Sequence, residues 1–262
     1  MKFAISGKGG VGKTSLAALL SRTFADSGYS VLAIDADPDS NLAATLGFPQ
    51  PEKITPISEM GDLVIERTGA QPGQVSSLFR LNPKVDDLPE KYWLEYNGVK
   101  LMVMGRTKRG GSGCYCPENT LLQALASHLL LARNEVVILD MEAGIEHLGR
   151  ATARAVDKLL VVVEPGRRSI ETAYTINKLA QDIGLHNVAV VGNKVRSQAD
   201  KEFLVSSLPG FSFLGFIPYD QAWVEADIGN RSLFDASTQI TTEVKNIYQA
   251  LISTTPPSGL TN

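Results

Sequence analysis

The chain has 262 residues, of which 44% are hydrophobic and 20% charged, so it can bury a sizeable core. Its net charge of −3 and pI of about 5.7 argue against broad binding to nucleic acids or anionic membranes. No stretch approaches the roughly 18 apolar residues of a membrane span. The first residues, MKFAISGKGG, lack the apolar region of a signal peptide. We therefore expect a soluble, cytoplasmic protein.

The first third of the chain alternates short apolar runs with helical patterns. A strand is expected at 2–6, followed by a glycine-rich loop and a helix at 14–26. A second strand at 30–34 precedes Pro38, which fits the first turn of a short helix running towards Leu46. The next residues, 49–98, are rich in Pro, Gly and Asp and are expected to form an insertion.

The rest of the chain continues this alternation. Continuous Val, Ile and Leu runs separated by helices indicate an α/β fold with a mostly parallel sheet covered on both faces. In such sheets ligands bind beyond the carboxyl ends of the strands. We expect one domain over 1–252, a disordered tail at 253–262, and Ser169 as the cap of a helix at 169–183. The other expected strands are 100–104, 136–140, 159–164, 188–193 and 213–218, and the other expected helices are 119–132, 149–156 and 241–252.

The most specific motif is GKGGVGKT, which matches the phosphate-binding pattern G-x-x-x-x-G-K-[ST] of P-loop nucleoside triphosphatases. Glycines let backbone N–H groups turn towards phosphate oxygens, and the following helix N-terminus adds positive potential. Lys13 is expected to reach the β- and γ-phosphates, and the Thr14 hydroxyl to bind Mg²⁺. A chance glycine-rich turn is the alternative. The expected nucleotide-binding residues are Gly7, Lys8, Gly9, Gly10, Val11, Gly12, Lys13, Thr14 and Ser15.

Acidic residues end two of the expected strands. The run VVILD has the form of a Walker B strand, so Asp140 is expected to hold Mg²⁺, through water. The second strand ends in Asp35-Ala36-Asp37, where a carboxylate can position the water that attacks the nucleotide. Asp35 is expected to act indirectly, by supporting residues that contact the nucleotide. Capping of the following helix is the alternative role for Asp37.

The chain has two cysteines, Cys114 and Cys116. Thiols at i and i+2 of an extended backbone point the same way, and the nearby Lys108, Arg109 and helix N-terminus favour thiolates. Two thiolates are half of a tetrahedral site, which the same pair of a second subunit would complete. Zn²⁺, Ni²⁺, Cu(I) or an iron–sulfur cluster suit such a site. Ordinary reduced thiols or a redox pair are the alternatives.

The early lysine of the loop carries a family resemblance. The string KGGVGKT, beginning at Lys8, resembles the deviant Walker A motif of the ATPase class that contains the nitrogenase iron protein, the arsenite-pump ATPase and the Min/Par ATPases. The resemblance implies a nucleotide-gated homodimer in which Lys8 crosses to the phosphates of the facing subunit. A solvated loop lysine is the alternative.

The same resemblance assigns further residues. It implies that Asp37 is the catalytic aspartate of the first switch, and that Gly144, in the second switch, offers its N–H to the γ-phosphate. It implies that Asn193, followed by Lys194, reads the edge of adenine, and that Pro218 and Tyr219 help to wall the base pocket. A strand-end turn residue is the alternative for Asn193. Three neighbours of the second switch are expected to be switch or surface residues: Glu142, Glu146 and His147.

Four segments resemble a narrower family, the CooC-type carbon monoxide dehydrogenase maturation ATPases. They are LNPKVDDLP at 81–89, GSGCYCPEN at 111–119, DMEAGIEH at 140–147 and VEPGRRS at 163–169. The resemblance runs from Met1 to about Ile252. It implies that ATP-driven changes of a homodimer help to insert nickel into the Ni–Fe–S centre of carbon monoxide dehydrogenase. Ni²⁺ or Zn²⁺ would then lie between the Cys114 and Cys116 pairs of two subunits.

Two other functions fit the class less well. A positioning ATPase of the Min/Par kind binds membrane or DNA. The C-terminal residues TTPPSGLTN hold no basic amphipathic helix and the chain has no dense Lys/Arg cluster, so neither partner is expected. In an electron-transfer reductase like the nitrogenase iron protein, an iron–sulfur cluster bridges the dimer and is held by two well-separated cysteines per subunit. Here both cysteines lie within one tripeptide, 114–116.

Overall fold

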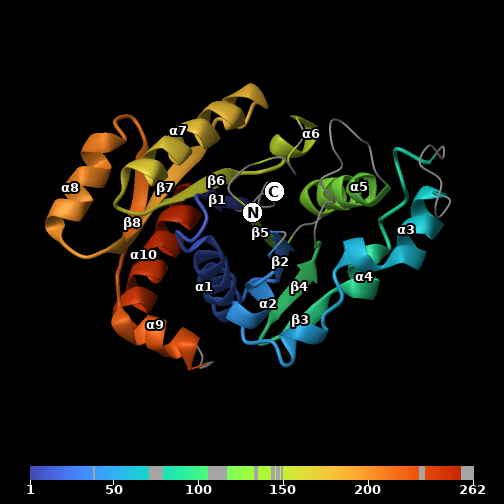
Figure 1. Ribbon diagram of the computed structural model, residues 1–262, viewed down its shortest axis with the longest axis horizontal. Helices are drawn as coiled ribbons and strands as arrows, with labels where there is room; N and C mark the ends of the chain where they lie inside the picture. The colour runs from blue at the N-terminus through green and yellow to red at the C-terminus, as the bar shows by residue number, and fades with distance from the viewer. Residues whose placement is uncertain are drawn as a thin grey trace, which may run out of the picture.

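The computed structural model describes residues 1–37, 39–70, 79–105, 117–132, 135–142, 145, 148, 150–229 and 234–254. Over these residues the chain forms one β-sheet with helices packed on both faces (Figure 1). The predicted class, α/β with a mostly parallel sheet, is therefore confirmed. Within the described part of the chain, no helix combines the length and the apolar character needed to cross a bilayer.

The strands form a single twisted sheet. They are β1 (Lys2–Gly7), β2 (Val31–Ala36), β3 (Leu94–Tyr96), β4 (Val99–Val103), β5 (Val136–Met141), β6 (Lys158–Val163), β7 (Val188–Val195) and β8 (Ser212–Pro218). In the described chain their order is β3-β4-β2-β5-β1-β6-β7-β8, and each neighbouring pair is parallel except β3 and β4. The chain runs from β1 to β2 on one side and later to β6 and β7 on the other. β1 therefore lies at a topological switch point, where ligands bind in such sheets.

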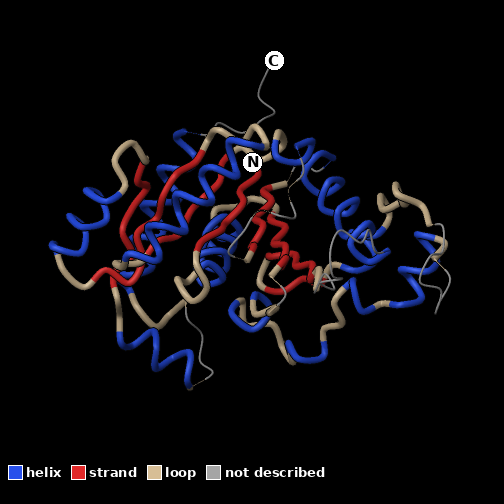
Figure 2. Tube along the Cα trace, turned by 45° about the horizontal axis from the view of Figure 1, so that its top comes forward, coloured by secondary structure: helices blue, strands red, loops and turns tan. Residues whose placement is uncertain are grey.

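Helices cover both faces of this sheet. They are α1 (Lys13–Asp26), α2 (Leu42–Thr45), α3 (Gly61–Thr68), α4 (Leu88–Tyr92), α5 (Pro117–Ala132), α6 (Arg150–Ala153), α7 (Arg167–Asp182), α8 (Gln198–Ser207), α9 (Gln221–Ile228) and α10 (Thr238–Thr254). Successive strand residues point to opposite faces. On β2, Leu32 and Ile34 therefore join the core formed with α5 and α7, whereas Val31 and Ala33 join the core formed with α1 and α10. Figure 2 shows the strands enclosed between these two helical layers.

The start of α7 differs from the prediction. The helix begins at Arg167 with Gly166 as its N-cap, so the prediction that Ser169 caps it is wrong. The buried Ser169 hydroxyl instead accepts a hydrogen bond from the backbone N–H of Glu164, at 3.0 Å. It therefore closes the turn between β6 and α7 rather than the end of the helix.

Other differences concern short elements and boundaries. The prediction lacks α8 and α9. The predicted insertion contains α3, α4, β3 and two 3₁₀ turns, Pro51–Lys53 and Ile57–Glu59. The predicted helix after Pro38 is only the single turn α2, and Pro38 itself lies outside the described residues. Helix α10 continues to Thr254, so the predicted tail begins within a helix, and residues 255–262 lie outside the described part.

Candidate functional site

Neighbouring strands bring five polar or glycine positions to one edge of the sheet. β1 ends at Gly7, β5 carries Asp140, β2 carries Asp35 and β7 carries Asn193, while Glu164 directly follows β6. Because these strands are parallel, their carboxyl ends lie at the same edge. Residues that are far apart in the chain therefore form one site.

The loop between β1 and α1 has the backbone of a phosphate cradle. Gly10 and Gly12 have φ of +79° and +96°, which lie in the left-handed region that favours glycine. A Cβ atom on Gly12 would also collide with the side-chain amide of Asn193. Helix α1 begins directly at Lys13, so its unpaired N–H groups and positive dipole end adjoin the loop. The buried Lys13 and the half-buried Thr14 line an open groove of about 1860 Å³.

Replacing Gly12 with alanine is expected to abolish nucleotide binding and to lower the free energy of unfolding by about 1–3 kcal/mol. The new methyl group both strains the backbone and displaces Asn193. Calorimetric titration with nucleotide and thermal unfolding measure the two effects. The control is Gly9→Ala, whose Cβ meets no atom within 4 Å and should leave stability unchanged. Wild-type nucleotide affinity in Gly12→Ala would contradict the close contact.

Asp140 carries a fully buried carboxylate. Neither of its oxygens makes a hydrogen bond within the described residues. Burial raises the pKa of Asp140 to about 8, although the Thr14 hydroxyl and the Lys13 ammonium nearby oppose that rise. A buried carboxylate is costly unless a cation completes it. Asp140 and Thr14 both offer the oxygen ligands that Mg²⁺ prefers, so this part of the site fits a Mg²⁺ ion.

Asp35 and Asp37 have different surroundings. The buried Asp35 carboxylate accepts hydrogen bonds from the backbone N–H of Leu42, at 3.0 Å, and of Asp37, at 3.2 Å. Burial raises the pKa of Asp35 to about 6, against the opposing effect of these hydrogen bonds. Asp37 lines the groove, and its carboxylate accepts a hydrogen bond from the backbone N–H of Asp39, at 2.9 Å. The N-terminus of α2 is therefore supported by Asp35, and Asp37 faces the groove that Lys13 and Thr14 line.

Asn193 and Lys194 brace the phosphate loop from β7. The buried Asn193 side chain donates to the carbonyl of Val11, at 2.7 Å, and accepts from the backbone N–H of Lys194, at 2.9 Å. Lys194 has φ of +56°, and its ammonium donates to the carbonyl of Gly10, at 2.5 Å. These contacts fix the cradle against β7. An Asn193 amide that reads a base must exchange its contact with Val11.

The next strand end supplies an aromatic surface. Pro218, which ends β8, pairs with Val195, two residues beyond Asn193. The backbone N–H of Tyr219 donates to the Val195 carbonyl, at 2.9 Å. The Arg196 guanidinium lies over the Tyr219 ring, 4.4 Å from its centroid, in a cation–π contact. Pro218 and Tyr219 are thereby held on the same side of the loop as Asn193.

Five residues assigned from the sequence lie outside the described part of the chain: Gly144, Glu146, His147, Cys114 and Cys116. Glu142 is described, and its backbone carbonyl accepts a hydrogen bond from the Ser6 hydroxyl, at 3.0 Å. Within the described ranges, no group of three or more His, Cys, Asp or Glu side chains is placed to hold a metal ion.

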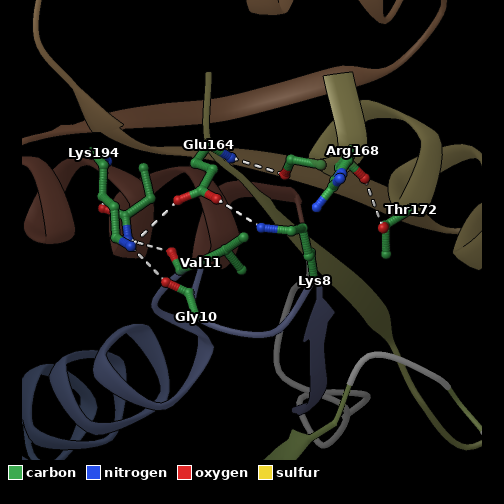
Figure 3. A network of polar contacts seen from close by, with 9 residues as sticks. Lys8, Gly10, Val11, Glu164, Arg168, Thr172 and Lys194 are labelled. Carbon is green, nitrogen blue, oxygen red and sulfur yellow. Dashed lines mark hydrogen bonds and ion pairs between the residues drawn. The ribbon is translucent and has the colours of Figure 1, made fainter. Parts of the chain in front are cut away.

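Sequence reasoning did not select Glu164. Its carboxylate accepts from the ammonium of Lys8, at 3.2 Å, and from that of Lys194, at 3.3 Å (Figure 3). One signal was present: an acidic residue directly follows a buried strand, as Asp37 does. What the sequence lacked was the position of β6 next to β1, which brings Glu164 to the loop.

Residues 2–233 match the family described as the CobQ/CobB/MinD/ParA nucleotide binding domain. The chain belongs to this family. Within the family, it is 44% identical over 260 residues to the carbon monoxide dehydrogenase accessory protein CooC of Rhodospirillum rubrum, covering 98% of each chain. It is also 44% identical over 255 residues to an uncharacterised ATP-binding protein of Methanocaldococcus jannaschii, covering 96% of this chain and 98% of the relative.

A family member of known structure shares the architecture. In the MinC:MinD cell division protein complex of Aquifex aeolicus, a chain with 22% identity matches with a TM-score of 0.69 over 96% of both chains. This likeness shows the fold alone. The family match and the two relatives identify the chain as an ATPase of the CooC type, with ATP as its nucleotide.

Proposed function

We propose that the chain is a dimeric maturation ATPase that assists nickel insertion into the Ni–Fe–S centre of carbon monoxide dehydrogenase. It would act as a single domain spanning 1–252. The observation that carries the proposal is the 44% identity to the CooC accessory protein over 98% of both chains. The structural likeness to MinD concerns the fold, so it does not favour a positioning function.

ATP hydrolysis is assigned to the groove at the end of β1. Lys13 would hold the β- and γ-phosphates, since it is buried beside the cradle. Asp37 would orient the attacking water from the groove wall. Thr14 and Asp140 would hold Mg²⁺, which when bound neutralises negative charge on the phosphate oxygens. The unpaired oxygens of Asp140 support this assignment.

The base is assigned to the other end of the cradle. Asn193, Lys194 and Pro218 would contact the adenosine part of ATP, next to the exposed ring of Tyr219. Gly144 would add a backbone N–H at the γ-phosphate. A second copy of the chain would contribute Lys8 to the phosphates.

The metal would be carried between two copies. Cys114 and Cys116 of each copy supply two thiolates, and four thiolates form a tetrahedral site that suits Zn²⁺ or Ni²⁺. We place this activity in the cytoplasm, where thiols stay reduced. Closure of the dimer by ATP and its opening after hydrolysis would then control access to the metal. No nucleic acid or membrane partner is proposed.

The double variant Cys114→Ala with Cys116→Ala is expected to lose bound metal. Wild type should bind about one Ni²⁺ or Zn²⁺ for every two chains, because four thiolates complete one tetrahedral site. Metal content after gel filtration measures this stoichiometry. Ser112→Ala changes the same segment without touching a thiol and should bind metal normally. Equal metal content in wild type and the double variant would refute the site.

The client is tested by activation of nickel-poor carbon monoxide dehydrogenase. Wild-type protein with Ni²⁺, Mg²⁺ and ATP should raise the dehydrogenase activity above that reached with Ni²⁺ alone. Omission of ATP, or use of the double cysteine variant, should remove the gain. Activation that is equal with and without ATP would contradict the proposed maturation function.

A further inference from the structure

Two lysines that face the phosphate cradle share one carboxylate. Lys8 belongs to the cradle, and Lys194 lies at the end of β7. Figure 3 shows both ammonium groups converging on Glu164 from opposite sides. The distances are 3.2 Å from Lys8 Nζ to Oε1 and 3.3 Å from Lys194 Nζ to Oε2.

Glu164 is ionised in this arrangement and leaves positive charge in excess. Burial alone would raise its pKa, but Lys8 and Lys194 outweigh that effect and hold the pKa below its usual range. One carboxylate therefore neutralises only half of the charge of two lysines. The remaining positive charge suits an anion with several oxygens, such as a nucleotide phosphate.

The carboxylate is anchored while the lysine that it holds is part of a loop. The Glu164 backbone N–H donates to Ser169 at the start of α7, at 3.0 Å. Lys194 has a second acceptor, the Gly10 carbonyl at 2.5 Å, so it does not depend on Glu164 alone. The Lys8 ammonium has Glu164 as its only partner among the described residues. Loss of the contacts with the Glu164 carboxylate would therefore free the Lys8 ammonium, whereas Lys194 would keep its hydrogen bond to Gly10.

The ion pair between Lys8 and Glu164 is weak enough to be broken when a competing anion binds. The Lys8 and Glu164 side chains are 35% and 24% exposed, so water screens their attraction. Partly exposed ion pairs of this kind shift an equilibrium by about 1.5- to 5-fold. Such a contact can be displaced by a phosphate group that carries more negative charge.

We propose that Glu164 is a positioning residue that holds Lys8 in the nucleotide-free chain, and that nucleotide phosphate on a second copy displaces it. Lys8 then reaches the facing subunit, and Glu164 sets the threshold at which the shared site assembles. This inference rests on the proposed dimeric function. It adds a residue of this chain that opposes assembly until nucleotide is present.

The test is the dimer dissociation constant of full-length protein with Mg²⁺ and a non-hydrolysable ATP analogue, measured by sedimentation velocity over a concentration series. Glu164→Gln should tighten the dimer by about 2- to 25-fold, because the contact is already lost in both copies and Lys8 is free in each. The change also takes the net charge from −3 to −2. Glu171→Gln, at an exposed position on α7, makes the same charge change away from Lys8 and should leave the constant unchanged.

The double variant Lys8→Ala with Glu164→Gln separates this role from a structural one. In the Lys8→Ala background, Glu164→Gln should no longer tighten the dimer. Glu164→Asp keeps the charge and should bring the constant back towards that of wild type. Thermal unfolding of each variant confirms folding, and a Glu164→Gln chain that does not fold would overturn a purely positioning role.

The outcomes distinguish this inference from the function on which it rests. A wild-type chain that stays monomeric with nucleotide would refute the dimer and the inference together. A wild-type dimer that Glu164→Gln leaves unchanged or weakens would refute the inference alone. Equal tightening with and without Lys8 would also refute it.

Discussion

Replacing Lys13 with alanine is expected to reduce ATP turnover by roughly 10²-fold or more, because we assign its buried ammonium to stabilising phosphate charge in the transition state. Phosphate release under saturating ATP measures the effect. The fold should survive, since the substitution removes a buried charge from the loop. Loss of turnover with an unchanged melting temperature would therefore report on phosphate binding.

Lys13→Arg provides a matched control for charge. Arginine keeps the positive charge, but its planar guanidinium cannot replace a compact ammonium within the buried start of α1. It should also be strongly impaired. If Lys13→Ala hydrolysed ATP within about threefold of the wild-type rate, the assignment of Lys13 to the phosphates would be wrong.

Asp140→Asn is expected to inactivate the enzyme and to stabilise the empty chain. Because the pKa of Asp140 is raised to about 8, the folded chain keeps a proton that the unfolded chain has released above about pH 4. The stabilising contribution of Asp140 is therefore complete below about pH 4 and is lost as the pH rises through 8. Asparagine resembles the protonated form, so the variant should lack this decline.

The difference in the free energy of unfolding between Asp140→Asn and wild type should therefore grow with pH. At pH 8 the variant should be more stable, by several kcal/mol, while its ATP turnover falls roughly 10²-fold. Urea unfolding without Mg²⁺ or nucleotide, at pH 5 and pH 8, measures the stability. A variant that is less stable than wild type at pH 8 would contradict the isolated state of Asp140.

Asp35→Asn is the matched contrast, because Asp35 is equally buried but hydrogen-bonded. An asparagine amide would turn an N–H group towards the N–H of Leu42 or of Asp37. The loss should be about 1–3 kcal/mol at neutral pH, opposite in sign to the effect at Asp140. Comparing the two variants tests whether burial alone, or the lack of a hydrogen-bond partner, determines the sign of the stability change.

Features that depend on neighbouring residues were predicted from the sequence. The P-loop is contiguous, and it lies between β1 and α1 as the motif requires. The apolar runs indicated a parallel sheet because strands that are buried on both faces are apolar throughout. The start of α7 was predicted wrongly because Ser169 has a partner in the preceding turn, which a local capping pattern does not reveal. The short helices α8 and α9 lack a strong periodic pattern.

The tertiary structure determined which residues that are distant in the sequence contact one another in the site. Lys8 and Glu164 are 156 positions apart, and Asn193 and Val11 are 182 apart. They meet because β6 lies beside β1 and β7 beside β6, and no local pattern encodes that strand order. The sequence by itself determined that a nucleotide cradle exists and which loop forms it. Only the packed sheet determined that Asp35 is hydrogen-bonded, that Asp140 has no hydrogen-bond partner among the described residues, and that Glu164 contacts Lys8.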